Sequence, residues 1–479
     1  HVSARHQLPA VTKITFDRWD GGLDVRGGAS TADANRLRVL RNCYVTTAKK
    51  IRKRPGLVHV ADVPSRSVGL FAGLGVLNTF QLNASDDTGT PLIVNRKLDN
   101  AGLSFERLGV YDCKVFAGNL YVSASHSGMG ISAENITTGE NIRHHYLDGG
   151  SSTVVTGAPQ SPAIAVIESR VWAGNADSVS HCALTKPRDW ATTGDAGFLP
   201  VGRQAQGSKY VTALGTYNNK LIAFTSDAAQ VWQIDADPNL NTLTQTVDIG
   251  TNLPWAHANL AGDVFFLAPL GVRSIVRQSA TDNLIDTDVG APIDTVLSSL
   301  VDTKTAKGVY LGSLGQYWLY SGSRAVVFTF SRSAKINAWS VYDFPIALDF
   351  VTELNGKPYM RSANSVYRMD VSSFSDNGAV IPVEIETSFV DFKAPGDLKQ
   401  VLGLDAVCEG SCDITHRFDP RQPSLETSPA IPITGDSRPG HLYPVELMTT
   451  NLSTVFRSSS AGPFELQSLT YHFENLGAI

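Results

Sequence analysis

The chain is poor in cysteine, in charge and in long apolar runs, and each shortage excludes a class of protein. Five cysteines among 479 residues are too few for a disulfide framework to hold the fold. Charged residues make up 18% of the chain, below the usual share of about 25%. Such low charge suits a protein that buries much of its surface, in part against copies of itself. No apolar run approaches the roughly 18 residues that a membrane-spanning helix needs.

Familiar catalytic and binding motifs are also lacking. The sequence contains no G-x-S-x-G, no H-E-x-x-H and no P-loop, so it predicts no catalytic residues and no cofactor. The net charge is −5, and bulk electrostatics therefore do not predict nucleic-acid binding. The sequence begins at His1 and not at a methionine. We therefore expect missing N-terminal residues, and a signal peptide is not excluded.

A repeated strand–turn–strand unit is what the sequence does contain. It is clearest over residues 211–277, where two copies are built around polar turns at Asn218-Asn219 and at Gly262. Similar units recur with central turns roughly 40–50 residues apart, a spacing typical of propeller blades. These turns fall near Asn119, Ser169, Asn218, Gly262, Gly315 and Gly356. The repeats predict an all-β, propeller-like array over residues 66–375, without a WD or kelch signature.

The two ends of the chain do not follow this repeat. Residues 1–65 are polar and irregular, with a helix predicted from Ser30 to Leu40. Residues 376–479 predict a separate antiparallel β domain, with a long loop rich in Pro, Ser and Thr over 422–443. Within the array, Pro292 opens a second predicted helix that ends near Leu300 and packs between blades.

A basic segment precedes the turn at Pro55-Gly56. Five of the six residues from Lys49 to Arg54 are basic, namely Lys49, Lys50, Arg52, Lys53 and Arg54. One interpretation is a solvated face before a turn. The other is an electrostatic contact with an acidic protein partner or with phosphates.

Ordered matches along the chain resemble the tail nozzle proteins of podoviruses, the short-tailed bacteriophages, which are also called tail tubular or hub proteins. The matches begin at residues 16–28 (FDRWDGGLDVRGG), 37–42 (LRVLRN) and 53–56 (KRPG). They continue at 144–149 (HHYLDG), 169–174 (SRVWAG), 189–190, 195–198, 230–232, 235–238, 271–274, 389–392 (FVDF) and Lys399. The order of these matches along the chain carries the resemblance.

The resemblance implies a homo-hexameric ring below the portal and the tail adaptor, with a channel that holds genomic DNA and then passes it without sequence recognition. It implies a propeller-like domain and a platform built from both chain ends, here 1–65 and 376–479. It places the protein in the virion tail, assembled in the host cytoplasm, with fibres or spikes as further possible partners. No channel-gating residue can be carried over.

The same resemblance guides the interpretation of the basic segment. A basic channel lining would slow DNA through many phosphate contacts. We therefore assign Lys49, Lys50, Arg52, Lys53 and Arg54 to a protein interface before a DNA contact.

The alternative function is a propeller that binds or cleaves glycans for receptor recognition. Glu384 and Glu386 stand two apart on a predicted strand, about 6–7 Å from each other, near the spacing of inverting glycosidases. Alternating charges on an exposed strand face are the more ordinary explanation. Six tryptophans, spread about one per unit, either stack sugars or pack between blades; they are Trp172, Trp190, Trp232, Trp255, Trp318 and Trp339. A single deep polar pocket on the propeller axis would favour this alternative over a ring with a through-channel.

Three further patterns invite metal or disulfide hypotheses. Residues 235–241 alternate oxygen-bearing side chains, but Leu240 and Thr246 break the calcium-loop pattern and favour a turn. His144-His145 lacks further ligands at zinc spacing, which favours a half-buried or surface pair.

The third pattern concerns the cysteines. Cys408 and Cys412 flank a three-residue loop, so a disulfide is a hypothesis, although a reducing cytoplasm argues against it. Cys43, Cys113 and Cys182 are interpreted as small core residues.

Overall fold

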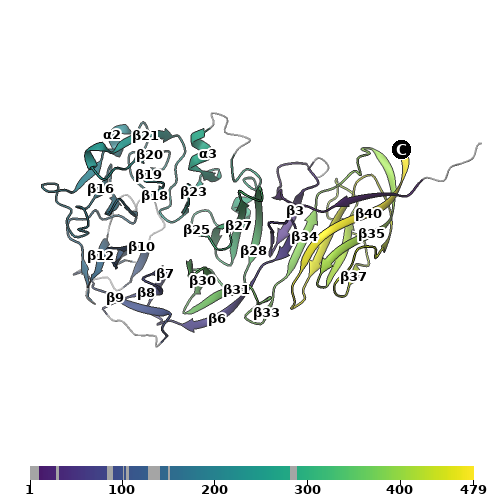
Figure 1. Ribbon diagram of the computed structural model, residues 1–479, viewed down its shortest axis with the longest axis horizontal. Helices are drawn as coiled ribbons and strands as arrows, with labels where there is room; N and C mark the ends of the chain where they lie inside the picture. Colours follow the sequence, from purple (N-terminus) through teal and green to yellow (C-terminus); the bar gives the residue numbers. More distant parts are fainter. Residues whose placement is uncertain are drawn as a thin grey trace, which may run out of the picture.

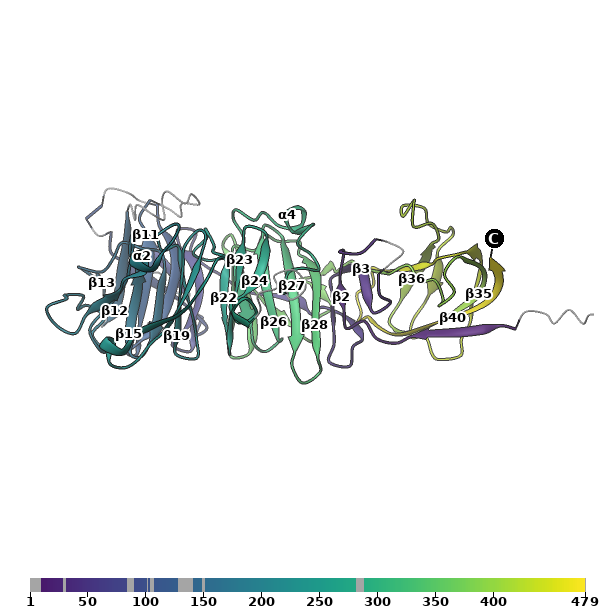
Figure 2. The same ribbon diagram turned by 90° about the horizontal axis from the view of Figure 1, so that it is seen from above.

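The molecule is elongated, with a ring of small β-sheets at one end and a β-sandwich at the other (Figures 1 and 2). The computed structural model describes residues 10–28, 32–83, 90–100, 102–103, 107–127, 141–148, 151–280 and 288–478. Helix is confined, within these ranges, to short pieces: α2 (Val201–Gln204), α3 (Ile275–Ala280), α4 (Leu297–Leu300) and the 3₁₀ turn η1 (Pro238–Leu240). The all-β prediction is confirmed.

Seven sheets within the described residues surround one axis and form a propeller (Figure 1). Each sheet contributes one innermost strand, and each innermost strand contacts the next around the ring. In order these strands are β7 (Val68–Gly73), β10 (Gly109–Phe116), β14 (Ile164–Ile167), β18 (Ala213–Tyr217), β22 (His257–Leu260), β25 (Lys307–Leu311) and β29 (Phe350–Leu354). Because β29 contacts β7, the ring is closed.

The outer strands of the blades follow each inner strand in chain order. The first three blades add β8 (Val76–Leu82), β9 (Ile93–Leu98), β11 (Asn119–Ser125), β12 (Ile142–Asp148), β13 (Ser151–Val154), β15 (Arg170–Gly174), β16 (Val179–His181) and β17 (Gly197–Leu199). The next two add β19 (Lys220–Phe224), β20 (Ala229–Gln233), β21 (Thr242–Val247), β23 (Asp263–Ala268) and β24 (Gly271–Ser274). The last two add β26 (Gln316–Ser321), β27 (Arg324–Ser331), β28 (Ile336–Asp343), β30 (Lys357–Ser362) and β31 (Ser365–Asp370).

The predicted central turns lie between the first and second strands of their blades. Asn218 and Asn219, for example, join β18 to β19 with φ of 45° and 57°. Both angles are left-handed, as a type I′ hairpin requires, and asparagine tolerates that region better than most residues. The polar turn signal and the strand alternation therefore placed the hairpins correctly.

The last blade is completed by a strand that precedes the first blade in sequence. β6 (Gly56–Asp62) pairs antiparallel with β31 and completes the last blade. The predicted domain boundary at residue 65 is therefore wrong, since β6 belongs to the propeller. Sequence spacing could not show this, because the two partners lie about 300 residues apart.

The platform is a two-layered sandwich that both chain ends build, as the resemblance implied. One sheet orders β38 (Tyr443–Thr449), β35 (Asp397–Glu409), β40 (Glu465–Ala478), β5 (Ile51–Lys53) and β4 (Cys43–Val45), with β1 (Thr12–Phe16) on β40. The other orders β3 (Arg36–Arg41), β34 (Val383–Thr387), β39 (Ser453–Ser458), β36 (Cys412–Arg417) and β37 (Ile431–Ile433), with β2 (Gly22–Leu23) on β3. A small hairpin, β32 (Ser375–Asp376) and β33 (Ala379–Val380), links propeller and platform.

Propeller and platform share a sheet and a core. β28, the outer strand of the sixth blade, pairs with β3, so blade and platform form one ten-stranded sheet. One apolar cluster runs from Phe265 and Trp339 of the propeller to Leu404 and Tyr471 of the platform. The two parts are therefore continuous in both hydrogen bonding and packing.

Both predicted helices need correction. Where the helix from Ser30 to Leu40 was expected, the structure has the strand β3, and residues 29–31 lie outside the described residues. Leu37 and Leu40 are both buried, and their three-residue spacing imitates a helix. A register shift between Leu37 and Val39 produces that spacing in a strand. The second helix forms only over Leu297–Leu300, preceded by turns.

Candidate functional site

The residues that carry the resemblance at the N-terminus meet at the joint between propeller and platform. Arg54, of the KRPG match, is fully buried and forms a two-pronged ion pair with Asp376. Its Nη1 and Nη2 donate to Oδ1 and Oδ2 of Asp376 at 2.8 and 2.6 Å. Nη2 also donates to the Asp343 carbonyl at 2.7 Å, and the guanidinium lies 4.2 Å from the Phe344 ring centroid. A single side chain thus joins the sixth blade, the chain entering β6, and the linking hairpin.

Asn42, the last residue of the LRVLRN match, completes this arrangement. Its Oδ1 accepts from Arg54 Nε at 3.0 Å and from the Asp343 amide at 2.8 Å, and its Nδ2 donates to the Pro382 carbonyl at 2.7 Å. Asn42 has φ of 56°, a conformation that asparagine adopts more readily than most residues. We call Asn42, Arg54, Asp343 and Asp376 the joint cluster.

Two glycines and a tryptophan of the same matches have sizes that suit the close packing at the joint. A Cβ on Gly56 would lie 2.0 Å from the Ser375 carbonyl oxygen, and one on Gly22 would lie 2.6 Å from the Ala338 Cβ. Trp19 is fully buried in the shared core. At these positions the matched residues therefore allow close packing and buried hydrogen bonding.

The basic segment is not a uniform solvated face. Lys53 and Arg54 are buried, and Lys53 donates to the carbonyls of Ser460 and Gly462 at 3.0 Å each. Burial lowers the pKa of Lys53. These two residues support the joint from within and do not lie on a surface, so their assignment to an interface needs correction. The hydrogen-bonding needs of a buried cation explain the basic residue types.

The other three basic residues lie at or near the surface. Lys49 pairs with Asp20 at 3.6 Å, and Lys50 donates to the Asp17 carbonyl. Arg52 pairs with Glu465 at 2.6 Å while its side chain stays 54% exposed. A role of Lys49, Lys50 and Arg52 at an interface stays a prediction.

A cavity of about 360 Å³ lies among the innermost strands of the propeller. Strands β7, β10, β22, β25 and β29 line it, together with the residues just before β22. We call it the axial cavity. Its size falls at the small end of the roughly 300–1,000 Å³ typical of ligand pockets.

Charged and aromatic side chains line the axial cavity. Lys307 donates to the Asp349 carbonyl at 2.6 Å and lies 4.0 Å from the Phe350 ring centroid, and burial lowers its pKa to about 8. Tyr111 and Trp255 stack with centroids 5.6 Å apart and planes 13° apart. Sequence reasoning missed this cavity, although Lys307 and Tyr111 could have been found as polar or aromatic residues on first strands of the repeat.

Two further groups set the polarity of the axial cavity. The Asp112 carboxylate lies 3.4 Å from the Lys114 ammonium, and the two residues stand two apart on the strand β10. His257 lines the cavity from β22, and burial lowers its pKa to about 4, so it is neutral near pH 7. The cavity therefore has two cations and a single carboxylate among its described lining residues.

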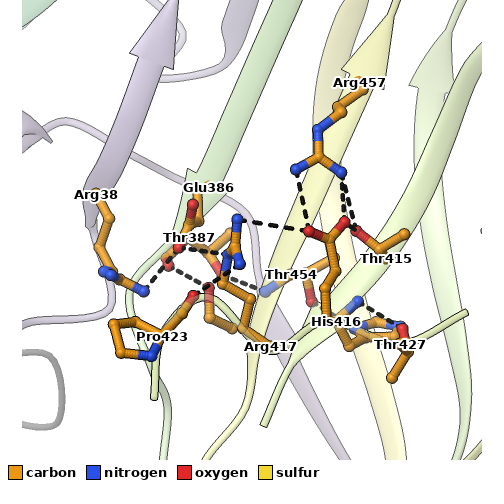
Figure 3. A network of polar contacts seen from close by, with 12 residues as sticks. Arg38, Glu386, Thr387, Thr415, His416, Arg417, Pro423, Thr427, Thr454 and Arg457 are labelled. Atoms are coloured by element: carbon orange, nitrogen blue, oxygen red, sulfur yellow. Dashed lines mark hydrogen bonds and ion pairs between the residues drawn. The ribbon is translucent and has the colours of Figure 1, made fainter. Parts of the chain in front are cut away.

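The paired glutamates lie in the platform, on β34, away from the axial cavity. Glu386 is buried, and its Oε1 lies 2.7 Å from Arg38 Nη1 and 3.1 Å from Arg417 Nε (Figure 3). The predicted exposed strand face is therefore wrong for Glu386. Two arginines, one from β3 and one from β36, offset the cost of burying this carboxylate.

A second glutamate extends this network toward the loop of residues 422–443. Glu426 Oε2 lies 3.1 Å from Arg457 Nη2 and 3.5 Å from Arg417 Nη2, and Thr415 donates to its Oε1 (Figure 3). The bonds from Arg457 and Thr415 lower the pKa of Glu426 to about 2. Each of the two glutamates, Glu386 and Glu426, is ion-paired with two arginines, which is typical of a structural role.

The histidine pair is buried, contrary to the prediction of a half-buried or surface pair. His144 Nδ1 contacts the Tyr121 hydroxyl at 2.9 Å and its Nε2 contacts the Ser161 carbonyl at 2.6 Å. His145 Nε2 lies 3.1 Å from His126 Nε2. Burial lowers the pKa of His144 to about 4 and that of His145 to about 3. Strand alternation points the two rings to opposite faces of a blade, and both faces pack against neighbours.

The remaining candidates have structural surroundings. Residues 235–241 form the turn between β20 and β21, in which Asp237 caps η1 by accepting from the Asn239 amide. Within the described residues, no group of three or more His, Cys, Asp or Glu is arranged to hold a metal ion. All five cysteines are buried free thiols, Cys408 and Cys412 included, so the disulfide is not formed.

The tryptophans pack between and within blades. Trp172, Trp190, Trp232, Trp318 and Trp339 are buried, which confirms core packing for them. Trp255 is half-buried and lines the axial cavity. In the part of the chain that the structure describes, no helix is both long and apolar enough to cross a membrane.

Comparison with known proteins gives structural neighbours only. No protein-family model and no curated protein sequence matches the chain. BamB from Moraxella catarrhalis aligns with TM-score 0.34 and 13% identity over 76% of this chain and 98% of its own. An exo-β-1,3-galactanase from Phanerochaete chrysosporium gives 0.27 and 11% over 78% and 99%, and the AfRom2 CNH domain 0.31 and 9% over 74% and 100%. Likeness of this degree does not bear on function, and the chain's own strand pairing establishes its propeller-like, all-β fold.

Proposed function

We propose that the chain is a structural virion protein, a subunit of the tail nozzle of a short-tailed phage. One observation carries the proposal. The N-terminal residues that resemble nozzle proteins, from Trp19 to Gly56, converge on the joint that ties both chain ends to the propeller. A sequence resemblance that coincides with a set of buried polar contacts is more informative than the same number of scattered matches.

The architecture suits a part that works by shape. A shared sheet and a continuous core join propeller and platform directly, which suits a ring subunit that must keep its shape around packaged DNA. In this proposal six copies extend the channel of the portal and adaptor, retain the genome, and pass it at infection. The low charge and slight acidic balance limit phosphate contacts along the channel. Lys49, Lys50 and Arg52 remain the proposed contacts to the adaptor ring.

Imaging of particles tests this proposal directly. Purified virions are labelled with antibody against this chain and viewed in negative stain, and its copy number is measured by quantitative mass spectrometry. We expect label on the tail axis and about six copies per particle. Label on peripheral fibres, or no label on particles, would overturn the nozzle assignment and favour receptor recognition.

A glycan-binding propeller is the second candidate, and the axial cavity favours it. Glycan cleavage is less well supported, because glycosidases generally use two carboxylates at the scissile bond. Asp112 is the single carboxylate among the described residues that line the cavity, and it is paired with Lys114. Glu384 and Glu386 lie in the platform, where Glu386 is buried between arginines.

A further inference from the structure

The axial cavity contains a lysine, Lys307, that has no carboxylate at ion-pair distance among the described residues. Lys307 Nζ donates to one backbone carbonyl, that of Asp349, and faces the Phe350 ring. The Asp349 carboxylate accepts from the Ala363 amide instead. Among the residues that the structure describes, none forms an ion pair with Lys307. Lys307 is partly buried, and the charge of Asp349 acts on it without forming an ion pair, so a bound anion would supply the direct ion pair that the ammonium lacks.

A second donor in the cavity also lacks a partner. The indole Nε1 of Trp255 is buried, and within the described residues no acceptor lies within hydrogen-bonding distance of it. Buried donors in folded proteins are nearly always paired, so an orphan at a cavity wall suggests an acceptor in the cavity. Lys307 and Trp255 come from different segments and together call for a ligand rich in acceptors.

The other lining residues indicate what the remainder of the ligand is like, apart from its carboxylate. Leu70, Phe71 and Val351 are apolar, and Tyr111 and Trp255 add flat aromatic surface. The ion pair of Asp112 and Lys114 can exchange hydrogen bonds with hydroxyl groups. The volume of about 360 Å³ suits a ligand with the bulk of one small ring.

We propose that the axial cavity is a binding site for a small carboxylate ligand with the bulk of a monosaccharide. The carboxylate accepts from the Lys307 ammonium and from the Trp255 indole N–H, and the ring packs against the apolar wall. This site lies inside the propeller of a single chain, so it goes beyond the proposed nozzle and does not depend on it. Two kinds of molecule offer this chemistry, an acidic sugar and a hydroxyl-free ring acid.

Isothermal titration calorimetry on the full chain at pH 7 distinguishes them with three probes of equal ring size. D-glucuronate has the carboxylate and hydroxyls, D-glucose has hydroxyls alone, and cyclohexanecarboxylate has the carboxylate alone. We expect at least one of the two carboxylates to bind tenfold or more tightly than glucose. The carboxylate that binds more tightly shows whether the ligand is an acidic sugar or a ring acid without hydroxyl groups. Binding of neither carboxylate, or glucose binding equally well, would overturn the proposal.

Two variants test the assigned donors. Lys307→Met keeps the aliphatic stem and removes the charge, and Trp255→Phe keeps an aromatic ring and removes the N–H. Losing a hydrogen bond to a charged group should weaken carboxylate binding about tenfold or more in each. Lys357→Met removes an exposed lysine of the same propeller and should leave affinity unchanged. Unchanged affinity in a folded Trp255→Phe protein would refute the site even if Lys307→Met failed to fold.

Discussion

Arg54 shows how one buried side chain holds two distant parts of the chain together. It is fully buried in the joint cluster, and all three of its guanidinium nitrogens donate hydrogen bonds. Removing one partner of a buried ion pair leaves the other charge in the interior without compensation. The basic residue type that looked like a surface signal is therefore a requirement of the interior.

Arg54→Met should strongly destabilise the protein. We expect a loss of about 3–5 kcal/mol in the free energy of unfolding, because Asp376 is left buried and unpaired. Urea unfolding followed by fluorescence measures it. Arg188→Met is the matched control, since Arg188 and Asp148 also pair at 2.9 Å but are 35% and 47% exposed. That change should cost about 1 kcal/mol or less. Equal effects in the two variants would contradict the joint cluster's role.

Buried histidines predict loss of stability in mild acid. Burial lowers the pKa of His144 and His416 to about 4 and that of His145 to about 3. Below pH 6.5, the approximate pKa of a histidine in the unfolded chain, these histidines bind protons in the unfolded chain but stay neutral in the folded protein. Stability is therefore complete above about pH 6.5 and falls as the pH drops toward 4, by up to about 1.4 kcal/mol per pH unit for each histidine.

Melting temperatures at pH 7, 6 and 5 check this expectation. His416→Gln should flatten the fall, because glutamine does not titrate. His441→Gln changes an exposed histidine and should leave the slope as it was. A melting temperature that stays constant from pH 7 to 5 would rule the explanation out.

At the scale of elements, the turn into β6 depends on a residue without a side chain. Gly56→Ala would place a Cβ 2.0 Å from the Ser375 carbonyl oxygen, and backbone must move to accept it. We expect a cost of about 1–3 kcal/mol, typical of overpacking, read from the urea midpoint. Gly462→Ala is the control, since its Cβ would meet nothing within 4 Å. A neutral Gly56→Ala would mean that β6 and β32 can separate freely.

The elements themselves were largely predictable from sequence. Turn residues such as Asn218-Asn219 and Gly356 marked the hairpins, because left-handed turns demand a few residue types. The strand β3 was mistaken for a helix, since a bulge between Leu37 and Val39 gave a helical spacing of apolar residues. The pairing of β6 with β31 was missed, because local patterns carry no information about partners far away in sequence.

The candidate sites were less predictable for a related reason. Sequence marked Lys53 and Arg54 as charged but could not show that the carbonyls and carboxylates of distant segments surround them. The axial cavity likewise gathers Tyr111, Trp255 and Lys307 from three blades. Each of the three is an ordinary residue within its own repeat, and the site exists only after ring closure.

At the scale of the whole molecule, continuity of sheet and core predicts cooperative unfolding. Propeller and platform share the ten-stranded sheet and one apolar cluster. Differential scanning calorimetry should therefore record a single heat-absorption peak, although the chain is long enough for two independent domains. Arg54→Met should broaden or split that peak. Two resolved peaks in the unaltered protein would contradict the continuity.

The position of β6 also sets a condition on synthesis. As the chain leaves the ribosome, β6 emerges before the first blade, yet its partner β31 appears about 300 residues later. The N-terminal strands β3 and β5 pair with β34 and β40, which are synthesised later still. Contacts so distant in sequence form late. A prematurely terminated chain therefore leaves both the ring and the platform open, so incomplete translation products are marked by exposed strand edges and are kept out of any assembly that needs the finished shape.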